Sequence, residues 1–470
     1  MAELDLSAPR RIHIVGIGGA GMSAIATVLA GTGHTVSGSD LKETKTLVRL
    51  RLVGVDARVG HAADHLPEAL DAVVVSSAIG AGNPEVDAAR ARGVAVLPRA
   101  AALAALVATR RGVAVAGSHG KTTTASMLAL ILRAAGWRPS FVIGGDLNEV
   151  GTNAAHDTGE WLVVEADESD GTFLELAPEA AIVTNVEADH LEHYGDFTAL
   201  TRAFEEFLAG VPGPRVACGD DPVLGAIAGQ VAGIATYGEG VACRYRLVDY
   251  EPARTGSSFS VLRGDDDRDG AGAGAAELLG AIELPVPGRH NALNALGAAA
   301  TALELGAPFE AIVTALRGFG GVARRFQFRG EVDGVTIVDD YAHLPSEVAA
   351  AIATARDGGW SPVVTVFQPH RYSRTERLWQ DFGDAFAGTD ALVLTDVYSA
   401  GETPRPGVSG RLILQAVLDA HPALPVRYLP RRTDLVDHVL GLARAGGMIL
   451  TLGAGDVTTL ADEWTAGTRG

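Results

Sequence analysis

The strongest chemical signal in the chain is a glycine-rich turn between a strand-like and a helix-like segment. Residues 113–132 read VAVAGSHGKTTTASMLALIL, in which Gly117–Thr123 separates an apolar run from an amphipathic one. Glycines let backbone N–H groups close around phosphate oxygens, and the start of a helix adds its positive dipole end. Lys121 can reach the β- and γ-phosphates of a nucleotide, and the Thr122 hydroxyl can ligate Mg²⁺. Because Val115 stands where the usual loop has its first glycine, an ordinary strand–helix turn is the alternative.

Acidic side chains follow two further strand-like segments. Segment 161–170, WLVVEADESD, delivers Glu165 at the end of an apolar run, and segment 181–190, AIVTNVEADH, places His190 just beyond another. Carboxylate oxygens suit a hard cation, and open α/β sheets bind ligands at the carboxyl ends of their strands. The pattern therefore predicts one phosphate and metal site at a shared sheet edge, although each acid alone also fits a solvated loop.

A second glycine-rich turn lies near the N-terminus. Segment 16–21, GIGGAG, follows an apolar strand and opens a helix, and Asp40 ends the next strand. This spacing matches the dinucleotide-binding fingerprint, with Asp40 on a ribose. A glycine turn at a helix start can equally bind the pyrophosphate of a nucleotide sugar. A nicotinamide-dependent oxidoreductase and a sugar-nucleotide site therefore both fit these residues.

Three later segments carry further candidate side chains. Segment 287–295, PGRHNALNA, puts a histidine and two amides at a helix start, where they cap the helix or face a nucleotide. Segments 324–326 and 338–343 read RRF and VDDYAH, and segment 367–374, FQPHRYSR, gathers two arginines and a histidine. Arginine forks bind carboxylate or phosphate bidentately, and a solvated basic surface is the alternative.

Strand-like runs alternate with helix-length segments along the chain, which predicts an α/β fold with parallel sheets flanked by helices. We expect three domains: a Rossmann-like one over 1–108, a P-loop ATPase-like one with a parallel or mixed sheet over 109–322, and a Rossmann-like one over 323–470. The acidic, glycine-rich stretch 264–280 is typical of a solvated loop that makes a long hairpin connection. The expected strands are 12–15, 35–39, 112–116, 161–165, 180–184, 335–339, 363–367, 391–395, 426–429 and 448–452, with a helix at 22–30.

Composition narrows the function classes. The 470 residues are 47% hydrophobic, which is ample for several cores, and carry a formal net charge of −19. So acidic a surface repels nucleic acid and anionic lipid, so we expect neither nucleic-acid binding nor membrane insertion. Two cysteines make no disulfide framework, and the first residues lack the basic start of a signal peptide, which favours the cytoplasm.

Taken in order, these motifs resemble those of the Mur ligase family. The resemblance spans nearly the whole chain and rests on GIGGAGMSAIA with SGSD, GSHGKTTT, EADESDGTFL, NVEADHLEHYGDF, PGRHNALNA, RRFQFRG, VDDYAHLP, FQPHRYSRT and VYSAGE. It implies ATP-dependent amide formation in peptidoglycan synthesis, and thereby roles in cell wall biogenesis, cell shape and cell division. EADESD together with FQPHRYSRT points to the alanine-adding members.

The resemblance also implies substrates, cofactors and residue roles. Those members ligate L-alanine to the carboxylate of UDP-N-acetylmuramate through an acyl phosphate, with ATP and Mg²⁺, as a monomer or weak homodimer. The implied catalytic residues are Lys121, Glu165, His190 and Arg325, and the implied metal ligands are Thr122, Glu165 and His190. ATP would be bound by Gly117, Ser118, His119, Gly120, Lys121, Thr122, Thr123, His290, Asn291, Asn294, Arg325 and Asp340. The UDP portion would be held by Gly18, Gly19, Ala20, Gly21, Met22, Asp40, Ser76 and Ser77, and the alanine by Tyr341, His343, His370, Arg371 and Arg374.

One residue departs from the family pattern, and three other readings stay open. Leu344 stands where the family usually has a second histidine before proline, so any role of that histidine is lost here. Within the ligases, an enzyme that adds a recycled tripeptide or a different residue to the same sugar acid is the alternative. A nicotinamide-dependent oxidoreductase would leave the GKTTT loop unexplained. A P-loop switch protein would hydrolyse ATP without the sugar substrate or the amino acid.

Overall fold

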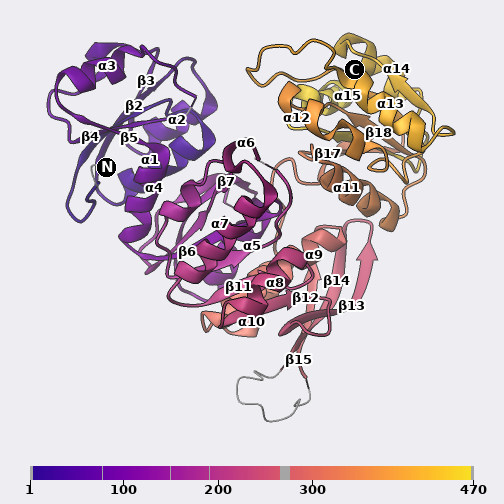
Figure 1. The fold of residues 1–470 in the computed structure, drawn as a ribbon, viewed down its shortest axis with the longest axis horizontal. Coiled ribbons are helices and arrows are strands. Elements are labelled where there is room, and N and C mark those ends of the chain that lie inside the picture. Colours follow the sequence, from indigo (N-terminus) through magenta and orange to yellow (C-terminus); the bar gives the residue numbers. More distant parts are fainter. Residues whose placement is uncertain (1–3, 77, 149, 190, 265–275, 467–470) are drawn as a thin grey trace. The chain divides into compact units, whose positions relative to one another are not determined.

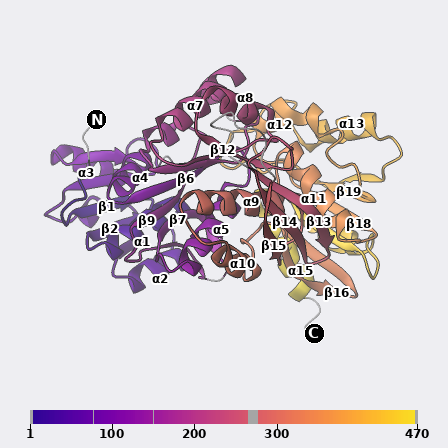
Figure 2. The ribbon, with the colours of Figure 1, turned by 90° about the horizontal axis from the view of Figure 1, so that it is seen from below.

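The computed structural model describes residues 4–76, 78–148, 150–189, 191–264 and 276–466. Strands and helices alternate along these residues and form three sheets, which confirms the predicted three-domain α/β fold (Figures 1 and 2). The chain divides into two compact units. The first holds Met1–Val248, Ser260–Ile282 and Leu293–Phe319, and the second holds Asp249–Phe259, Glu283–Ala292 and Gly320–Gly470. The expected domain boundaries near 108 and 322 stay a prediction.

The first sheet has five parallel strands in the order β3-β2-β1-β4-β5. The chain reverses its winding direction between β1 and β4, and such switch points open a crevice at the carboxyl ends of the strands. The glycine-rich turn and Asp40 both lie at this edge. The strands are β1 (Arg11–Val15), β2 (Thr35–Asp40), β3 (Asp56–Val59), β4 (Ala72–Val75) and β5 (Ala95–Pro98), and the helices are α1 (Ala20–Gly31), α2 (Lys45–Leu52), α3 (Pro84–Ala91) and α4 (Arg99–Ala108).

The second sheet has ten strands in the order β15-β14-β13-β12-β11-β10-β6-β9-β7-β8, with β7 and β8 antiparallel. Its strands are β6 (Arg111–Ala116), β7 (Ser140–Leu147), β8 (Thr152–Ala155), β9 (Trp161–Glu165), β10 (Ala180–Val183), β11 (Arg215–Cys218), β12 (Ile234–Gly238), β13 (Tyr245–Ala253), β14 (Gly256–Arg263) and β15 (Glu277–Leu284). Its helices are α5 (Lys121–Ala134), α6 (Leu191–Tyr194), α7 (Phe197–Gly210), α8 (Pro222–Gln230), α9 (Arg289–Glu304) and α10 (Phe309–Arg317). The stretch expected to connect a hairpin joins the neighbouring strands β14 and β15, although residues 265–275 lie outside the described residues.

The third sheet has six strands in the order β16-β17-β21-β18-β19-β20, in which only β16 runs antiparallel to its neighbour. Apolar clusters around Trp360 and Phe386 and around Val366 and Trp464 bury its strands, as parallel sheets require. The strands are β16 (Gln327–Val332), β17 (Val335–Asp340), β18 (Val363–Phe367), β19 (Ala391–Leu394), β20 (Val426–Tyr428) and β21 (Met448–Leu452). The helices are α11 (Pro345–Asp357), α12 (Tyr372–Leu378), α13 (Gly410–Ala420), α14 (Leu435–Leu440) and α15 (Thr459–Ala466).

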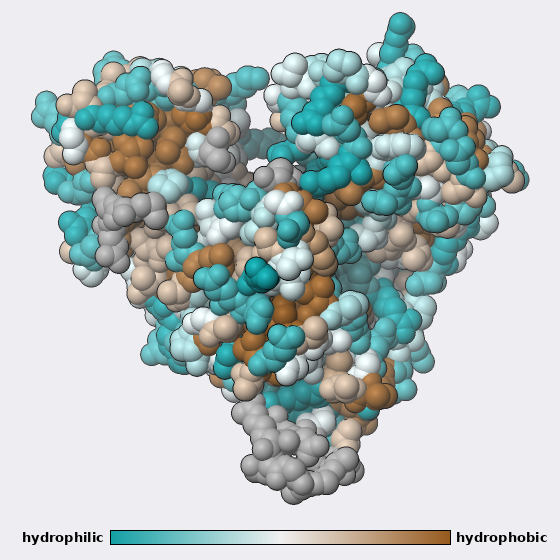
Figure 3. Space-filling view, in the orientation of Figure 1, coloured by the Kyte–Doolittle hydropathy of each residue, from teal (hydrophilic) through white to brown (hydrophobic). Residues whose placement is uncertain are grey.

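Within the described ranges, no helix combines the length and apolar character needed to cross a membrane. Hydrophilic residues are spread over the face drawn in Figure 3, between smaller hydrophobic areas. This distribution fits the acidic, charged composition of the chain.

A buried ionic cluster lies inside the first sheet's domain. The Glu85 side chain, at the start of α3, is fully buried and accepts a hydrogen bond from the Ser39 hydroxyl at 2.5 Å. His65 Nδ1 lies 3.1 Å from Glu85 Oε1, and His13 Nε2 lies 3.6 Å from Glu85 Oε2. Burial alone would raise the pKa of Glu85, but the nearby His13 imidazole and the hydrogen bond from Ser39 outweigh it and lower the pKa to about 2. The ionised carboxylate therefore stabilises the fold at Ser39, the neighbour of Asp40 in β2.

We predict that Glu85→Gln destabilises the protein at neutral pH by about 3 kcal/mol, since each pKa unit is worth about 1.4 kcal/mol. The folded-state pKa lies below the unfolded one, so this stabilisation is present above pH 4.5 and is lost as the pH falls toward 2. Urea unfolding of wild type and variant at a series of pH values measures the difference. The exposed Glu68→Gln is the control, and a difference between Glu85→Gln and wild type that does not change with pH would contradict the assignment.

Candidate active site

The phosphate-loop segment forms a tight turn from β6 into α5 that only glycine can build at two positions. Gly117 has φ +127° and Gly120 has φ +79°. A Cβ at Gly117 would lie 2.2 Å from Thr184 Oγ1, and one at Gly120 would lie 2.4 Å from Asn294 Oδ1. The predicted amide Asn294 is thereby placed directly on the loop, at the N-terminus of the 14-residue helix α5.

The loop is fixed by the end of β10 through a residue that the sequence did not single out. Ser118 N donates a hydrogen bond to the Asn185 carbonyl at 3.0 Å, and His119 N donates one to Asn185 Oδ1 at 2.7 Å. Asn185 stands in the NVEADH segment, where sequence analysis assigned only His190. The signal that could have found it is its place directly after an apolar strand next to the loop's own strand.

Lys121 is held against carboxylates at the shared sheet edge. Its Nζ donates to Glu168 Oε1 at 2.8 Å and to the Gly117 carbonyl at 2.6 Å. Burial would lower the pKa of Lys121, but the negative charges of Glu168 and Glu165 outweigh it and raise the pKa. Lys121 is therefore a cation, as phosphate binding requires. Glu168 lies in the EADESD segment, and no role was predicted for it from the sequence.

Thr122 and Glu165 also meet at this edge, as predicted from strand-end positions. Thr122 Oγ1 donates to Glu165 Oε2 at 3.0 Å, and Gly144 N donates to the same oxygen at 2.7 Å. A hydroxyl and a carboxylate are hard oxygen donors, and Mg²⁺ takes one or two such protein ligands and completes its shell with phosphate and water. The residues present therefore fit Mg²⁺. In the described part of the chain, no three His, Cys, Asp or Glu side chains gather into a metal cage.

Two of the predicted site residues, Ser77 and His190, lie outside the described residues. Their predicted roles toward the UDP portion and the metal stay predictions. The other predicted residues of the first unit lie at the two glycine-rich turns and at strand ends, except Asn294, which lies in α9.

The N-terminal turn contacts the acid that ends β2. Gly18 N donates to Asp40 Oδ2 at 2.9 Å, which places Asp40 on the glycine turn. Residues Gly19 to Met22 enter α1, and the Met22 side chain is buried, so it offers a ligand only its backbone. Ser76 lines a cavity of about 350 Å³ at the carboxyl ends of β4 and β5, a volume in the range of small-molecule sites.

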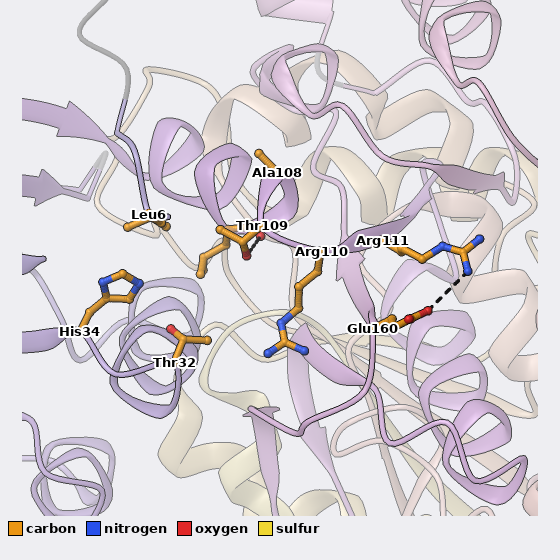
Figure 4. A pocket seen from close by; sticks show the side chains of 9 residues that line it. Leu6, Thr32, His34, Ala108, Thr109, Arg110, Arg111 and Glu160 are labelled. Carbon is orange, nitrogen blue, oxygen red and sulfur yellow. Dashed lines mark hydrogen bonds and ion pairs between the residues drawn. The ribbon is translucent and has the colours of Figure 1, made fainter. Parts of the chain in front are cut away.

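A larger cavity, of about 590 Å³, lies near the amino ends of strands in the second sheet, away from the phosphate loop at their carboxyl ends (Figure 4). Its lining includes Thr32, His34 and Arg110, together with residues at the amino ends of β6 and β9. None of the predicted site residues lines it. Because open α/β sheets bind their ligands at the carboxyl ends of strands, the smaller cavity is the candidate substrate site.

In the second unit, the structure gathers the aromatic and basic side chains that were predicted from two separate motifs. The His343 and His370 rings lie 5.6 Å apart, and Tyr341 lies edge-on to His343. Arg374 Nη1 and His370 Nδ1 are 3.0 Å apart. Tyr398, from the VYSAGE segment, stacks on His370 with ring centroids 5.9 Å apart and was not assigned from the sequence.

The histidines of this cluster are electrically neutral at pH 7. Burial lowers the pKa of His370 to about 3, with His343 and Arg374 adding to the effect. Burial likewise lowers the pKa of His343. Arg371 has φ +70° and donates its N–H to the Tyr398 carbonyl at 2.8 Å, so its strained backbone is tied to the same cluster. Neutral imidazoles can accept a proton from an incoming ammonium group.

A second set of predicted residues lies in the same unit, with Asp340 at the end of β17. Asp340 is buried and accepts hydrogen bonds from Phe326 N at 2.6 Å and Ala342 N at 2.7 Å. Burial raises the pKa of Asp340 to about 6. Burial, together with the charge of Arg325, lowers the pKa of His290 to about 4.

Asn291 and Arg325 have partners within the second unit. Asn291 Nδ2 donates to the Pro287 carbonyl at 2.7 Å, so this amide is tied to the turn that precedes α9. The Arg325 guanidinium lies 5.3 Å above the Tyr341 ring and 3.9 Å from Glu347 Oε1. Arg325 therefore stands beside the residues expected to surround the amino acid.

The departure at Leu344 leaves the neighbouring histidine in place. Leu344 is buried and directly precedes α11. The Glu347 carboxylate accepts backbone hydrogen bonds from His343 at 2.9 Å and Leu344 at 3.2 Å. These contacts fix the His343 backbone without an imidazole at position 344.

Sequence comparisons match the three regions of the chain to three parts of one family. The matches are the Mur ligase family, catalytic domain, over residues 11–111, the Mur ligase middle domain over 115–302, and the Mur ligase, glutamate ligase domain over 324–455. The chain belongs to the Mur ligase family.

Individual relatives match over nearly their whole length. The UDP-N-acetylmuramate–L-alanine ligase of Bradyrhizobium sp. (strain ORS 278) is 48% identical over 95% of both chains. That of Kineococcus radiotolerans is 48% identical over 96% of this chain and 95% of its own. The crystal structure of the UDP-N-acetylmuramate-alanine ligase from Thermotoga maritima is 28% identical with a TM-score of 0.80, covering 98% of this chain and 99% of that one. A murein peptide ligase from Psychrobacter arcticus, 24% identical with a TM-score of 0.68 over 97% and 98% of the two chains, shares the fold.

We predict that Gly120→Ala weakens ATP binding at least tenfold, because a Cβ there would strike Asn294 and a side chain strains the φ of +79°. Gly136→Ala is the matched control: Gly136 has the same φ of +79°, but a Cβ there meets nothing within 4 Å. We expect the control to lose about 1 kcal/mol of stability and no ATP affinity. Titration calorimetry measures the ATP affinity of both variants. A folded Gly120→Ala variant with wild-type ATP affinity would show that the glycine loop does not bind the phosphates.

Proposed function

We propose that this chain is an ATP-dependent ligase that joins L-alanine to the carboxylate of UDP-N-acetylmuramate, in peptidoglycan precursor synthesis. Relatives named for this reaction are 44–48% identical to the chain over nearly its whole length. The observation that carries the proposal is the buried Lys121–Glu168 pair on a glycine-built phosphate loop. A loop of this kind binds a triphosphate and activates it for phosphoryl transfer.

The first chemical step makes the sugar acid reactive. A carboxylate oxygen is too poor a leaving group for an amine to displace in neutral water. Transfer of the ATP γ-phosphoryl group to the carboxylate gives an acyl phosphate and ADP. We assign Lys121 to the charge that develops on the phosphoryl oxygens and propose that Arg325 joins it.

The second step forms the amide. The alanine amine attacks the acyl carbon, and the tetrahedral oxyanion collapses to the amide with loss of phosphate. The amine must first lose a proton, and the neutral His343 and His370 are the described candidates to accept it. We assign Arg371 and Arg374 to the alanine carboxylate, since guanidinium forks pair with carboxylates. Tyr341 would complete the wall of this site.

The remaining roles follow the resemblance. We propose that Mg²⁺ is held by Thr122, Glu165 and His190 and that it supplies positive charge to the phosphates. His290, Asn291, Asn294 and Asp340 would contact the adenosine portion of ATP. The N-terminal turn, with Asp40, Ser76 and Ser77, would hold the UDP portion. We also propose a cytoplasmic location, where ATP is available and free thiols such as those of Cys218 and Cys243 persist, and a monomer or weak homodimer.

The decisive experiment measures phosphate release from ATP with UDP-N-acetylmuramate and L-alanine together, and with each omitted. We expect release to require both substrates. Release from ATP alone would identify a switch protein instead. A panel that offers the recycled tripeptide in place of alanine tests the other ligase activity, and preference for the tripeptide would overturn the alanine assignment.

We predict that Lys121→Ala abolishes phosphate release, with a loss of at least 10³-fold, while binding of UDP-N-acetylmuramate stays within threefold of wild type. Lys121 lies on the ATP loop, whereas the sugar nucleotide is assigned to the N-terminal turn. Calorimetry and the phosphate assay measure the two properties separately, with the exposed Lys45→Ala as control. Equal loss of UDP-N-acetylmuramate binding would show that the two sites are assigned wrongly.

A further inference from the structure

Arg99 connects the two glycine-built sites of the first unit, and neither the sequence motifs nor the proposed mechanism assigns it. It is the first residue of α4 and lines the 350 Å³ cavity together with Ser76 and Asp170. A Cβ placed on Gly21 would lie 2.8 Å from Arg99 Nη1, so the guanidinium rests against the start of α1. Its other terminal nitrogen, Nη2, donates to Asp167 Oδ2 at 3.1 Å.

Asp167 belongs to the acidic segment that serves the ATP loop. It lies between Glu165, which meets Thr122, and Glu168, which pairs with Lys121. Ser169 N donates a hydrogen bond to Asp167 Oδ1 at 3.0 Å, and the other carboxylate oxygen, Oδ2, accepts the hydrogen bond from Arg99. Arg99 is thus the ion-pair partner of Asp167.

The position of Arg99 matches the charge of the expected substrate. A nucleotide sugar carries a diphosphate, and the N–H groups of a glycine turn at a helix start hold such a group. Among the described lining residues of this cavity, the cations are Arg90 and Arg99. Arg90 is largely exposed and pairs with Asp87 at 3.7 Å, whereas Arg99 lies on the turn itself. In a chain with a net charge of −19, the diphosphate needs such a local cation.

The central region also fixes the turn rigidly beside Arg99. Asn153 Nδ2 donates to the Ala20 carbonyl at 2.9 Å, in the first turn of α1. A Cβ on Gly31, at the other end of α1, would lie 2.5 Å from the His156 Cβ. Because α1 is held at both ends, the Arg99 guanidinium is already positioned beside Gly21 before a ligand binds there.

We propose that Arg99 is a positioning residue that binds the diphosphate of UDP-N-acetylmuramate and exchanges Asp167 for it when the sugar nucleotide enters. This inference rests on the proposed function. The ion pair with Asp167 is partly exposed and therefore weak, whereas an arginine–phosphate pair is bidentate and stronger. The exchange places the sugar acid relative to the turn and leaves Asp167 without its guanidinium partner next to the ATP loop.

The first test replaces the guanidinium and measures binding of UDP-N-acetylmuramate by calorimetry without ATP. We expect Arg99→Met to weaken binding at least tenfold and Arg99→Lys to recover part of the loss. In turnover, the KM for the sugar nucleotide should rise while the KM values for ATP and alanine stay within about twofold. Arg49→Met is the matched control, because Arg49 also bridges to the central region, to Asp146 at 3.0 Å, but does not line the cavity. A loss in Arg49→Met equal to that in Arg99→Met would make Arg99 a structural bridge only.

The second test identifies the group of the sugar nucleotide that Arg99 binds. UDP-N-acetylglucosamine carries the same diphosphate and no carboxylate. We expect Arg99→Met to weaken its binding by the same factor as that of UDP-N-acetylmuramate. A loss confined to UDP-N-acetylmuramate would assign Arg99 to the sugar's carboxylate and overturn the diphosphate assignment.

The third test examines the exchange of partners. Asp167→Asn should tighten UDP-N-acetylmuramate binding by about two- to fivefold, because Arg99 then leaves no charged partner, and this gain should vanish in the Arg99→Met background. Weaker binding in Asp167→Asn in both backgrounds would overturn the exchange.

Titrations of the wild-type protein distinguish the proposed function from the proposed role of Arg99. A wild type that binds no UDP-N-acetylmuramate contradicts the proposed function, whereas a wild type that binds it and an Arg99→Met that binds it equally contradict only the role of Arg99.

Discussion

The ion pair between Lys121 and Glu168 is the interaction on which the ATP site depends. A lysine buried on a phosphate loop must stay charged to hold phosphate, yet burial alone favours its neutral form. Glu168 keeps it charged before any nucleotide is bound, and the Gly117 carbonyl takes a further ammonium hydrogen. The cation is therefore present and oriented in advance, so triphosphate binding requires the exchange of one anionic partner for another rather than the creation of a charge.

The same arrangement recurs at the N-terminal glycine turn, to which we assign the sugar nucleotide. Asp40 holds the Gly18 N–H, and Asp167 holds Arg99, so the turn and its arginine are each paired with a carboxylate of the chain. An acidic protein that handles anionic substrates satisfies its cations and N–H donors internally, and the substrates compete for them. Such competition lowers affinity for anions in general and favours ligands that reach several donors at once.

Sequence reasoning foresaw the positions that follow from strand and helix periodicity. The predicted strand 161–165 coincides with β9, so Glu165 was correctly expected beside Thr122 at the edge of the sheet. Asn185 and Tyr398 escaped it, because each acts through a contact with a loop from elsewhere in the chain: Asn185 on Ser118 and His119, and Tyr398 on His370. Periodicity shows which strand end a residue occupies, whereas the facing loop is known only once the strands are ordered in the sheet.

The neutral histidines of the second unit show how burial and nearby arginines act together in amide formation. Arg374 supplies the charge that a substrate carboxylate needs, and the same charge discourages protonation of His370. The guanidinium that we assign to the amino acid's carboxylate therefore also keeps the neighbouring imidazole neutral. A surrounding of low polarity and positive charge also lowers the pKa of the ammonium group itself, since it disfavours any further cation there. Carboxylate binding and amine deprotonation are thus consequences of one electrostatic environment. The discrimination against glycine has a different basis: it depends on one methyl group, worth roughly 1–3 kcal/mol.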